Sequence, residues 1–253
     1  MSDGSASPRG AGGPRAPGWS VVIPAFDEER RLPRYLDEIV TYFEGRGEPY
    51  EVIVVDDGSR DRTVPIAEAY AAAHPAVVVH ALGANGGKGA AVRHGMLAAR
   101  GRLRLFADAD GATPIAELKR LEAALHGGAD VAIASRVLVD RSVAVVTRPH
   151  RVAAGRVFNW LVARLGLRGI ADSQCGFKAF TAAAAEALFR PLVSRGFGFD
   201  VELLLRAQRA SLRVSEIAVN WTDQVGSKVG VITTGPRMLL EILRARRRLG
   251  PFA

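Results

Sequence analysis

Val52-Ile53-Val54-Val55-Asp56-Asp57-Gly58-Ser59 is the stretch that decides the fold of this 253-residue chain. Its four consecutive β-branched residues predict a strand that is buried on both faces, as in the centre of a parallel sheet. The strand ends in two carboxylates and a glycine, and Asp61 follows at a position where it can cap the next helix. Ligands of open α/β sheets bind at the carboxyl ends of the strands, so this strand end predicts part of a binding site.

Two more apolar runs end in acidic residues. Val21-Val22-Ile23-Pro24-Ala25-Phe26-Asp27-Glu28-Glu29 precedes a predicted helix, and Leu103 to Ala107 leads into Asp108-Ala109-Asp110-Gly111. Carboxylates at i and i+2 just after a strand are hard oxygen ligands that suit Mg²⁺ or Mn²⁺. Acidic turns after strands are common, and one such pair would be weak support. Because three acidic strand ends are expected on one edge of a sheet, together they predict one shared site.

From Ser20 onward, strand and helix patterns alternate, which predicts an α/β fold with a Rossmann-like, mostly parallel sheet flanked by helices. The expected strands cover residues 20–25, 51–56, 77–81, 102–107, 130–135 and 213–219. The expected helices cover residues 29–43, 62–73, 88–99, 115–125, 151–165, 181–190 and 199–210. Residues 137–150 are expected to form a flexible loop, and Pro236 is expected to open the last helix.

The composition divides the chain into three parts. Residues 1–18 are rich in Gly, Pro, Ser and Ala and lack the apolar core of a signal peptide, so we expect a disordered tail. Residues 19–235 form the expected α/β domain. No apolar run approaches the roughly 20 residues that a membrane-spanning helix needs. The single cysteine, Cys175, excludes a disulfide within the chain, favours a reducing compartment and is expected to be a packed thiol.

Residues 236–253 predict an amphipathic basic helix, because six large apolar residues share it with five arginines. The formal net charge of +8 favours an anionic partner. The helix either packs on the domain with a solvated basic edge or lies on an anionic membrane surface, and the pattern alone does not separate these alternatives. The basic cluster lacks interleaved aromatic residues, which argues against a nucleic-acid-binding module.

These motifs resemble those of glycosyltransferase family 2, whose fold is GT-A, from about Ser20 to the C-terminus. The more specific likeness is to the dolichyl-phosphate β-glucosyltransferase branch, with the polyprenyl-phosphate mannosyltransferases as close relatives. It is carried by Asn85-Gly86-Gly87-Lys88-Gly89, Asp172-Ser173-Gln174-Cys175-Gly176-Phe177-Lys178, Phe199-Asp200-Val201-Glu202, and Val219-Asn220-Trp221-Thr222 with Gly226-Ser227-Lys228. The mannosyltransferases have glutamine where this chain has Ala112, which favours glucose over mannose.

The resemblance implies an inverting enzyme that moves glucose from UDP-glucose to a polyprenyl phosphate. It would be cytoplasmic and peripheral to the inner face of the membrane. Asp108 and Asp110 would hold Mg²⁺ or Mn²⁺, and Asp56 would recognise the base or the ribose. Lys88, at a predicted helix N-terminus, would face phosphate. The remaining donor-site residues are Pro24, Ala25 and Glu28, which would line the nucleotide pocket, and Ser227 and Lys228, which would close over the diphosphate.

On the acceptor side, Arg136 corresponds to the family arginine that binds the acceptor phosphate. Asp110, Arg136, Asp172 and Gln174 are the residues that we assign to catalysis. A phosphate monoester is already anionic near neutral pH, because its second pKa is about 6, so no general base is required. An alcohol acceptor would need Asp172 or Asp200 as the base.

Several roles stay open. Arg148 and Arg151 either bind the acceptor or belong to a solvated loop, and Asp57 either contributes to the site or fixes the turn before Gly58. Asp200 and Glu202 either contact the sugar or belong to a helix start. The alternative functions are a family 2 transferase with a water-soluble acceptor, a GDP-mannose-using mannosyltransferase, and a nucleotide-sugar sensor without activity.

Overall fold

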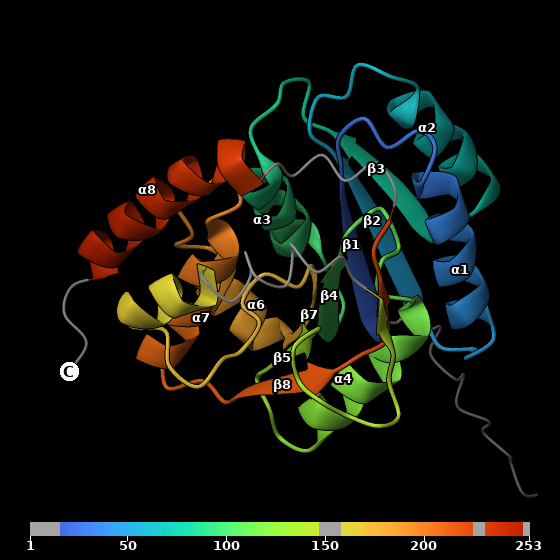
Figure 1. Ribbon diagram of the computed structural model, residues 1–253. Coiled ribbons are helices and arrows are strands. Elements are labelled where there is room, and N and C mark those ends of the chain that lie inside the picture. Colours follow the sequence, from blue (N-terminus) through green and yellow to red (C-terminus); the bar gives the residue numbers. More distant parts are fainter. Residues whose placement is uncertain (1–15, 147–157, 225–230, 250–253) are drawn as a thin grey trace, which may run out of the picture.

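A seven-stranded sheet in the order β3-β2-β1-β4-β7-β5-β8 runs through the computed structural model, which describes residues 16–146, 158–224 and 231–249 (Figure 1). The strands are β1 (Trp19–Ala25), β2 (Tyr50–Asp56), β3 (Val77–Ala81), β4 (Leu103–Ala107), β5 (Val131–Ser135), β7 (Phe177–Thr181) and β8 (Val214–Ala218). β1, β2, β3 and β4 pair in parallel, as do β5 and β8. The predicted α/β fold with a mostly parallel sheet is confirmed.

Helices cover both faces of this sheet (Figure 1). They are α1 (Leu32–Glu44), α2 (Thr63–Ala73), α3 (Lys88–Ala98), α4 (Leu118–His126), α6 (Ala182–Phe189), α7 (Phe199–Arg209) and α8 (Val231–Leu249), with a further helical segment at residues 158–164. Alternation along β2 sets the two cores: Val52 and Val54 pack with α1 and α4, while Ile53 and Val55 pack with α3. The sheet is therefore buried on both faces, as the β-branched run predicts.

The sequence analysis missed strand β7. This strand lies between β4 and β5 and is antiparallel to both, so it interrupts the parallel order. Phe177 and Ala179 face one core, and Phe180 faces the other. Lys178, the second residue of the strand, is fully buried and pairs with Asp200 of α7, which is 2% exposed. A lysine within a short apolar segment does not predict a buried strand. This lysine can be buried only because a carboxylate from a helix distant in the sequence pairs with it.

Several predicted boundaries were wrong. Helix α1 begins at Leu32 and not at residue 29, because the backbone N–H groups of Arg31 and Leu32 both turn back to the Glu28 carbonyl. Helix α8 begins at Val231, and Pro236 lies inside it. The expected loop at 137–150 contains a two-residue strand, β6 (Val145–Val146), which pairs with β9 (Trp221–Thr222). Residues 147–150, and residues 151–157 of the next predicted helix, lie outside the described residues.

The last residues of the predicted tail, residues 16–18, are ordered. Gly18 donates from its backbone N–H to the Pro49 carbonyl at 2.7 Å and accepts from Leu103 at 3.0 Å. The Pro17 carbonyl accepts from Arg102 at 3.2 Å. The chain therefore joins the sheet before residue 19, because these backbone groups extend the pairing of β1. Residues 1–15 lie outside the described part of the chain.

Replacing Lys178 with methionine keeps the side-chain length but leaves the Asp200 carboxylate buried without its cation. We expect the free energy of unfolding to fall by about 3–5 kcal/mol, the usual result of breaking a buried ion pair from one side. The double replacement Lys178→Met with Asp200→Leu should restore most of this loss, because no uncompensated charge remains. Urea denaturation measures both variants, and a single variant as stable as the wild type would contradict the assigned role of the pair.

Candidate functional site

The carboxyl ends of β1, β2 and β4 open into a cavity of about 360 Å³. Six of the predicted site residues line it, namely Pro24, Ala25, Glu28, Lys88, Asp108 and Asp110. Asp56 ends β2 next to Asp57, which is part of the lining, and does not itself line the cavity. The structure thus brings the acidic ends of three strands together, as the sequence predicts. Ser227 and Lys228, with Arg148 and Arg151, lie outside the described residues.

Each carboxylate of the Asp108–Asp110 pair faces a cation from another element. Lys88 Nζ, in the first turn of α3, lies 2.6 Å from Asp108 Oδ1, and Arg31 Nη1 lies 3.8 Å from Asp110 Oδ2. Burial and the neighbouring Asp108 charge raise the pKa of the Asp110 carboxyl. Burial opposes the charge of Lys88, but Asp108 and Asp200 outweigh it and raise the pKa of the ammonium group. The cavity lining therefore brings two cations, Arg31 and Lys88, together with four carboxylates, namely Glu28, Asp57, Asp108 and Asp110.

Gly176 makes room for the Asp108 side chain. A Cβ atom at Gly176 would lie 2.0 Å from Asp108 Oδ2, so any side chain at this position would displace the carboxylate. The Asp108 backbone N–H donates to the Gly176 carbonyl at 2.9 Å. The turn at residues 172–176 is thereby fixed against the end of β4, which explains why glycine occurs in this motif.

Of the two adjacent carboxylates, Asp56 binds the turn that follows β2, and Asp57 binds the glycine-rich loop. Asp56 Oδ2 accepts from the backbone N–H groups of Gly58 and Ser59, both at 3.0 Å, so Asp56 and not Asp57 fixes the turn. Among the described residues, its buried Oδ1 atom has no hydrogen-bond partner. Asp57 instead accepts from Gly86 at 2.7 Å and Gly87 at 2.9 Å. Asp57 therefore holds the glycine-rich loop before α3, and burial raises the pKa of its carboxyl.

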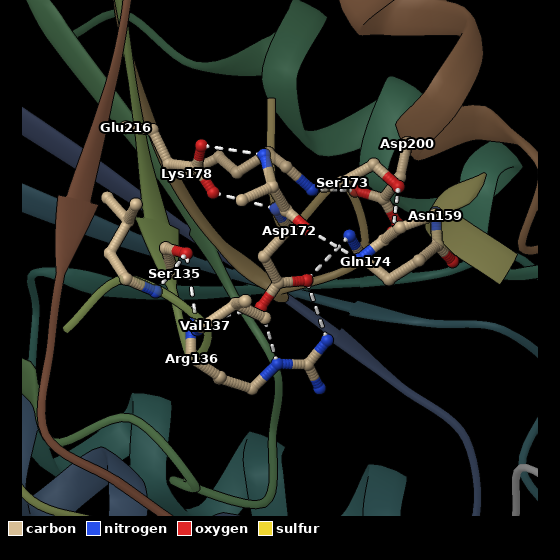
Figure 2. Close-up of polar contacts among 12 residues, drawn as sticks. Ser135, Arg136, Val137, Asn159, Asp172, Ser173, Gln174, Lys178, Asp200 and Glu216 are labelled. Carbon is tan, nitrogen blue, oxygen red and sulfur yellow. Dashed lines mark hydrogen bonds and ion pairs between the residues drawn. The ribbon is translucent and has the colours of Figure 1, made fainter. Parts of the chain in front are cut away.

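Arg136 and Asp172 form a two-pronged ion pair at the other end of the turn (Figure 2). Arg136 Nε and Nη2 lie 2.7 and 2.8 Å from the two carboxylate oxygens, and the Arg136 backbone N–H donates to Oδ2 at 3.0 Å. Burial would raise the pKa of the Asp172 carboxyl, but the charge and hydrogen bonds of Arg136 outweigh it and lower that pKa. Asp172 is consequently a poor proton acceptor in this arrangement.

Neighbouring groups hold this pair in place. Glu216 of β8 accepts from the backbone N–H groups of Ala171 and Asp172 at 2.8 and 2.7 Å (Figure 2). The Arg136 guanidinium lies 5.4 Å from the centre of the Trp221 ring. The Gln174 backbone N–H donates to Asp172 Oδ1 at 3.1 Å, and its buried Nε2 atom has no partner among the described residues. The predicted residues Arg136, Asp172 and Gln174 thus lie together.

Two other candidates have structural partners, and a third is packed in the core. Asp200 pairs with Lys178, and Glu202 accepts from the backbone N–H groups of Val193 and Ser194. Both carboxylates lie in the first turn of α7, which favours the helix-start alternative over sugar contact. Burial raises the pKa of the Cys175 thiol to about 12, and its side chain is 1% exposed, as expected for a packed thiol.

Sequence reasoning missed two residues of the cavity wall. Arg31 donates to both carboxylate oxygens of Glu28, three residues earlier, and this charge spacing could have drawn attention to it. Phe197 lies in the loop between α6 and α7, and its ring centre is 5.9 Å from Lys88 Nζ. No local pattern distinguishes this phenylalanine from a core residue.

The sequence of the chain is similar to that of known proteins. The family model for glycosyl transferase family 2 matches residues 20–189. The dolichyl-phosphate beta-glucosyltransferase of Drosophila melanogaster is 45% identical over 223 residues, which cover 83% of this chain and 68% of the relative. The Homo sapiens protein of the same name is 39% identical over 242 residues, covering 90% of this chain and 75% of that protein.

Solved structures share the fold. Glucosyl-3-phosphoglycerate synthase from Mycobacterium tuberculosis, in complex with Mn²⁺, UDP and glucosyl-3-phosphoglycerate, superposes with a TM-score of 0.69 at 20% identity, covering 91% of this chain and 80% of that chain. The complex of the same enzyme with Mn²⁺ and UDP-glucose gives a TM-score of 0.67 over 91% of this chain and 79% of that chain. The predicted GT-A fold is confirmed.

Proposed function

We propose that this chain, which belongs to glycosyltransferase family 2, transfers glucose from UDP-glucose to a polyprenyl phosphate such as dolichyl phosphate. Activity as a glycosyltransferase follows from the family match and from relatives of 39% and 45% identity. Those relatives are named for β-glucosyl transfer to dolichyl phosphate, and a protein of the same fold is known with UDP-glucose. Inversion at the anomeric carbon would give the β-linked product.

The observation that carries this proposal is the strand-end cavity in which Asp108 and Asp110 face Lys88 and Arg31. A sugar nucleotide needs a recognised base, a neutralised diphosphate and an accessible anomeric carbon. The buried Oδ1 of Asp56 is an acceptor without a partner in the described chain, which suits a uracil N–H or a ribose hydroxyl. Lys88 lies in the first turn of α3, where the helix dipole also favours phosphate.

The carboxylate pair fits a divalent metal. Burial and the neighbouring Asp108 charge raise the pKa of the Asp110 carboxyl, so a bound cation would relieve the repulsion between the two carboxylates. The described residues contain no group of three or more His, Cys, Asp or Glu side chains that could hold an ion. Asp108 and Asp110 would therefore share it with diphosphate oxygens and water, as Mg²⁺ sites commonly do. When bound, Mg²⁺ or Mn²⁺ would neutralise charge on the leaving diphosphate.

The acceptor side favours a phosphate over an alcohol. Asp172 and Asp200 are the carboxylates that could serve as a general base, and both are buried in ion pairs. A phosphate acceptor needs no base, because its oxygen is already anionic at neutral pH. We assign Asp172 and Gln174 to positioning, with Asp172 holding the Arg136 guanidinium toward the acceptor phosphate. A water-soluble acceptor is the second candidate, because a protein of similar fold is known in complex with glucosyl-3-phosphoglycerate.

The C-terminal helix offers a membrane contact. Ile242 and Ala245 of α8 are fully buried against the domain, while the opposite side exposes Leu240 at 47%. Four arginines are exposed on α8, namely Arg237, Arg244, Arg247 and Arg248. Among the described residues, no helix is long and apolar enough to cross a membrane. We therefore assign α8 both sequence-based roles: it packs on the domain and presents a basic surface to anionic lipid.

UDP binding should depend on a divalent metal. Calorimetry with Mn²⁺ should give a dissociation constant that rises at least tenfold after chelation or in Asp110→Asn, which corresponds to about 1.4 kcal/mol. The matched control is Glu68→Gln, which removes an exposed carboxylate of α2 and should leave the affinity unchanged. Equal UDP affinity with and without metal would refute the metal role of Asp108 and Asp110.

Arg136→Lys should keep the positive charge beside Asp172 but lose the planar fork. We expect kcat/KM for the lipid phosphate to fall about tenfold, in line with about 1.4 kcal/mol of lost binding, while UDP affinity stays unchanged. Transfer assays and calorimetry on the same preparation separate these effects. A parallel loss of UDP affinity would place Arg136 on the donor side.

Vesicle flotation should show binding to anionic liposomes that weakens with salt, because exposed charges are screened. Each near-surface arginine should contribute about 1 kcal/mol at low salt. Replacing four exposed arginines of α8 by glutamine should therefore abolish flotation without lowering the melting temperature; they are Arg237, Arg244, Arg247 and Arg248.

The control for flotation removes the same charge from exposed arginines elsewhere, namely Arg34, Arg62, Arg102 and Arg190. This variant should still float. Equal losses in both variants would indicate a general charge effect, and a wild-type protein that ignores anionic vesicles at low salt would favour the water-soluble acceptor.

A further inference from the structure

One wall of the cavity is held in place by the C-terminal helix. The loop at residues 194–198 carries Phe197, which lines the cavity. Glu241 of α8 accepts from the backbone N–H of Gly196 at 2.8 Å and from that of Gly198 at 2.9 Å. The two hydrogen bonds therefore bracket Phe197 from either side, through a single carboxylate that is more than 40 residues away in the sequence.

The approach of this carboxylate is close enough to require glycine. A Cβ atom at Gly196 would lie 2.8 Å from Glu241 Oε1, and one at Gly198 would lie 2.8 Å from the Glu241 Cβ. Hydrogen bonds from backbone N–H groups to a carboxylate are stronger than neutral ones. Glu241 is thus fitted to this loop and is more than a solvated charge on the helix.

The same loop supports the start of α3. The Arg195 carbonyl accepts from the Ala90 backbone N–H at 3.1 Å, and a Cβ atom at Gly87 would lie 2.4 Å from that carbonyl oxygen. Asp57 binds Gly86 and Gly87 from β2. The glycine-rich segment before Lys88 is therefore held between Asp57 and the loop that Glu241 fixes.

These contacts lead directly to the acidic pair. Lys88 Nζ lies 5.9 Å from the centre of the Phe197 ring, within the range of a cation–π contact, and 2.6 Å from Asp108 Oδ1. A shift of Phe197 would open the cavity wall beside Lys88, and a shift of residues 86–87 would move the first turn of α3.

We propose that Glu241 is a positioning residue of the nucleoside-diphosphate site, so that α8 helps to set the affinity for the donor. This inference rests on the proposed function, because it takes the cavity as the site of the sugar nucleotide. Glu241 acts through Phe197 and the Gly86–Gly87 backbone and does not itself touch the donor.

Glu241→Gln tests the inference, because the amide keeps one acceptor oxygen but presents an NH₂ group to the second backbone N–H. Calorimetry with UDP and Mn²⁺ should show a dissociation constant about tenfold above that of the wild type, which corresponds to about 1.4 kcal/mol. KM for UDP-glucose should rise with it, while KM for the lipid phosphate stays unchanged. Amide hydrogen exchange at residues 194–198 should become faster.

Ile242→Val is the matched control, since it loosens the packing of the same helix by about 0.5–1.5 kcal/mol but keeps the carboxylate. It should lower the melting temperature and leave UDP affinity unchanged. A Glu241→Gln protein that binds UDP like the wild type would overturn the inference, as would equal losses of affinity in both variants. A wild type that does not bind UDP would overturn the proposed function and this inference together.

Discussion

The Asp108 carboxylate is the group on which the arrangement of the site depends. It lies against the Cα atom of Gly176, where no side chain fits, and its oxygen is 2.6 Å from Lys88 Nζ. The Asp108 carboxylate is therefore the point at which three segments meet: β4, the turn at residues 172–176 and the start of α3. Gly176 brings the Arg136–Asp172 pair to the same region, since only three residues lie between Asp172 and Gly176. The residues that we propose for the donor and for the acceptor are thus placed by one short turn.

Patterns within short stretches of sequence predicted the buried strand β2 and the acidic strand ends. The β-branched run at 52–55 indicated a buried strand, and the three acidic strand ends were expected to meet because parallel strands end at one edge. Strand β7 could not be predicted in this way. Its Lys178 is acceptable in the core only because Asp200 pairs with it, and no short window of sequence around Lys178 contains that carboxylate.

In the site, too, the sequence predicted individual residues, whereas the contacts between distant segments could not be predicted. Asp56 and Asp57 are adjacent carboxylates, and the sequence does not show which of them reaches the turn and which reaches Gly86 and Gly87. Arg136 and Asp172 were each predicted, but their pairing depends on β5 and the turn after residue 171 being neighbours in space. The roles of Glu241 and Phe197 could not be predicted from the sequence. The hydrogen bonds of Glu241 join α8 to the backbone on either side of Phe197, more than 40 residues earlier.

The charge balance of the cavity gives a physical reason for metal dependence. Asp108 and Asp110 face Lys88 and Arg31, but Arg31 also pairs with Glu28, and Asp57 adds a further carboxylate to the lining, so carboxylates outnumber cations in the cavity. A sugar diphosphate entering alone would add negative charge to this half-buried site, which is unfavourable where water screens poorly. A divalent cation would offset both the excess of carboxylates and the charge of the diphosphate. The proposed donor and its metal should therefore bind with positive cooperativity, because each supplies the charge that the other lacks.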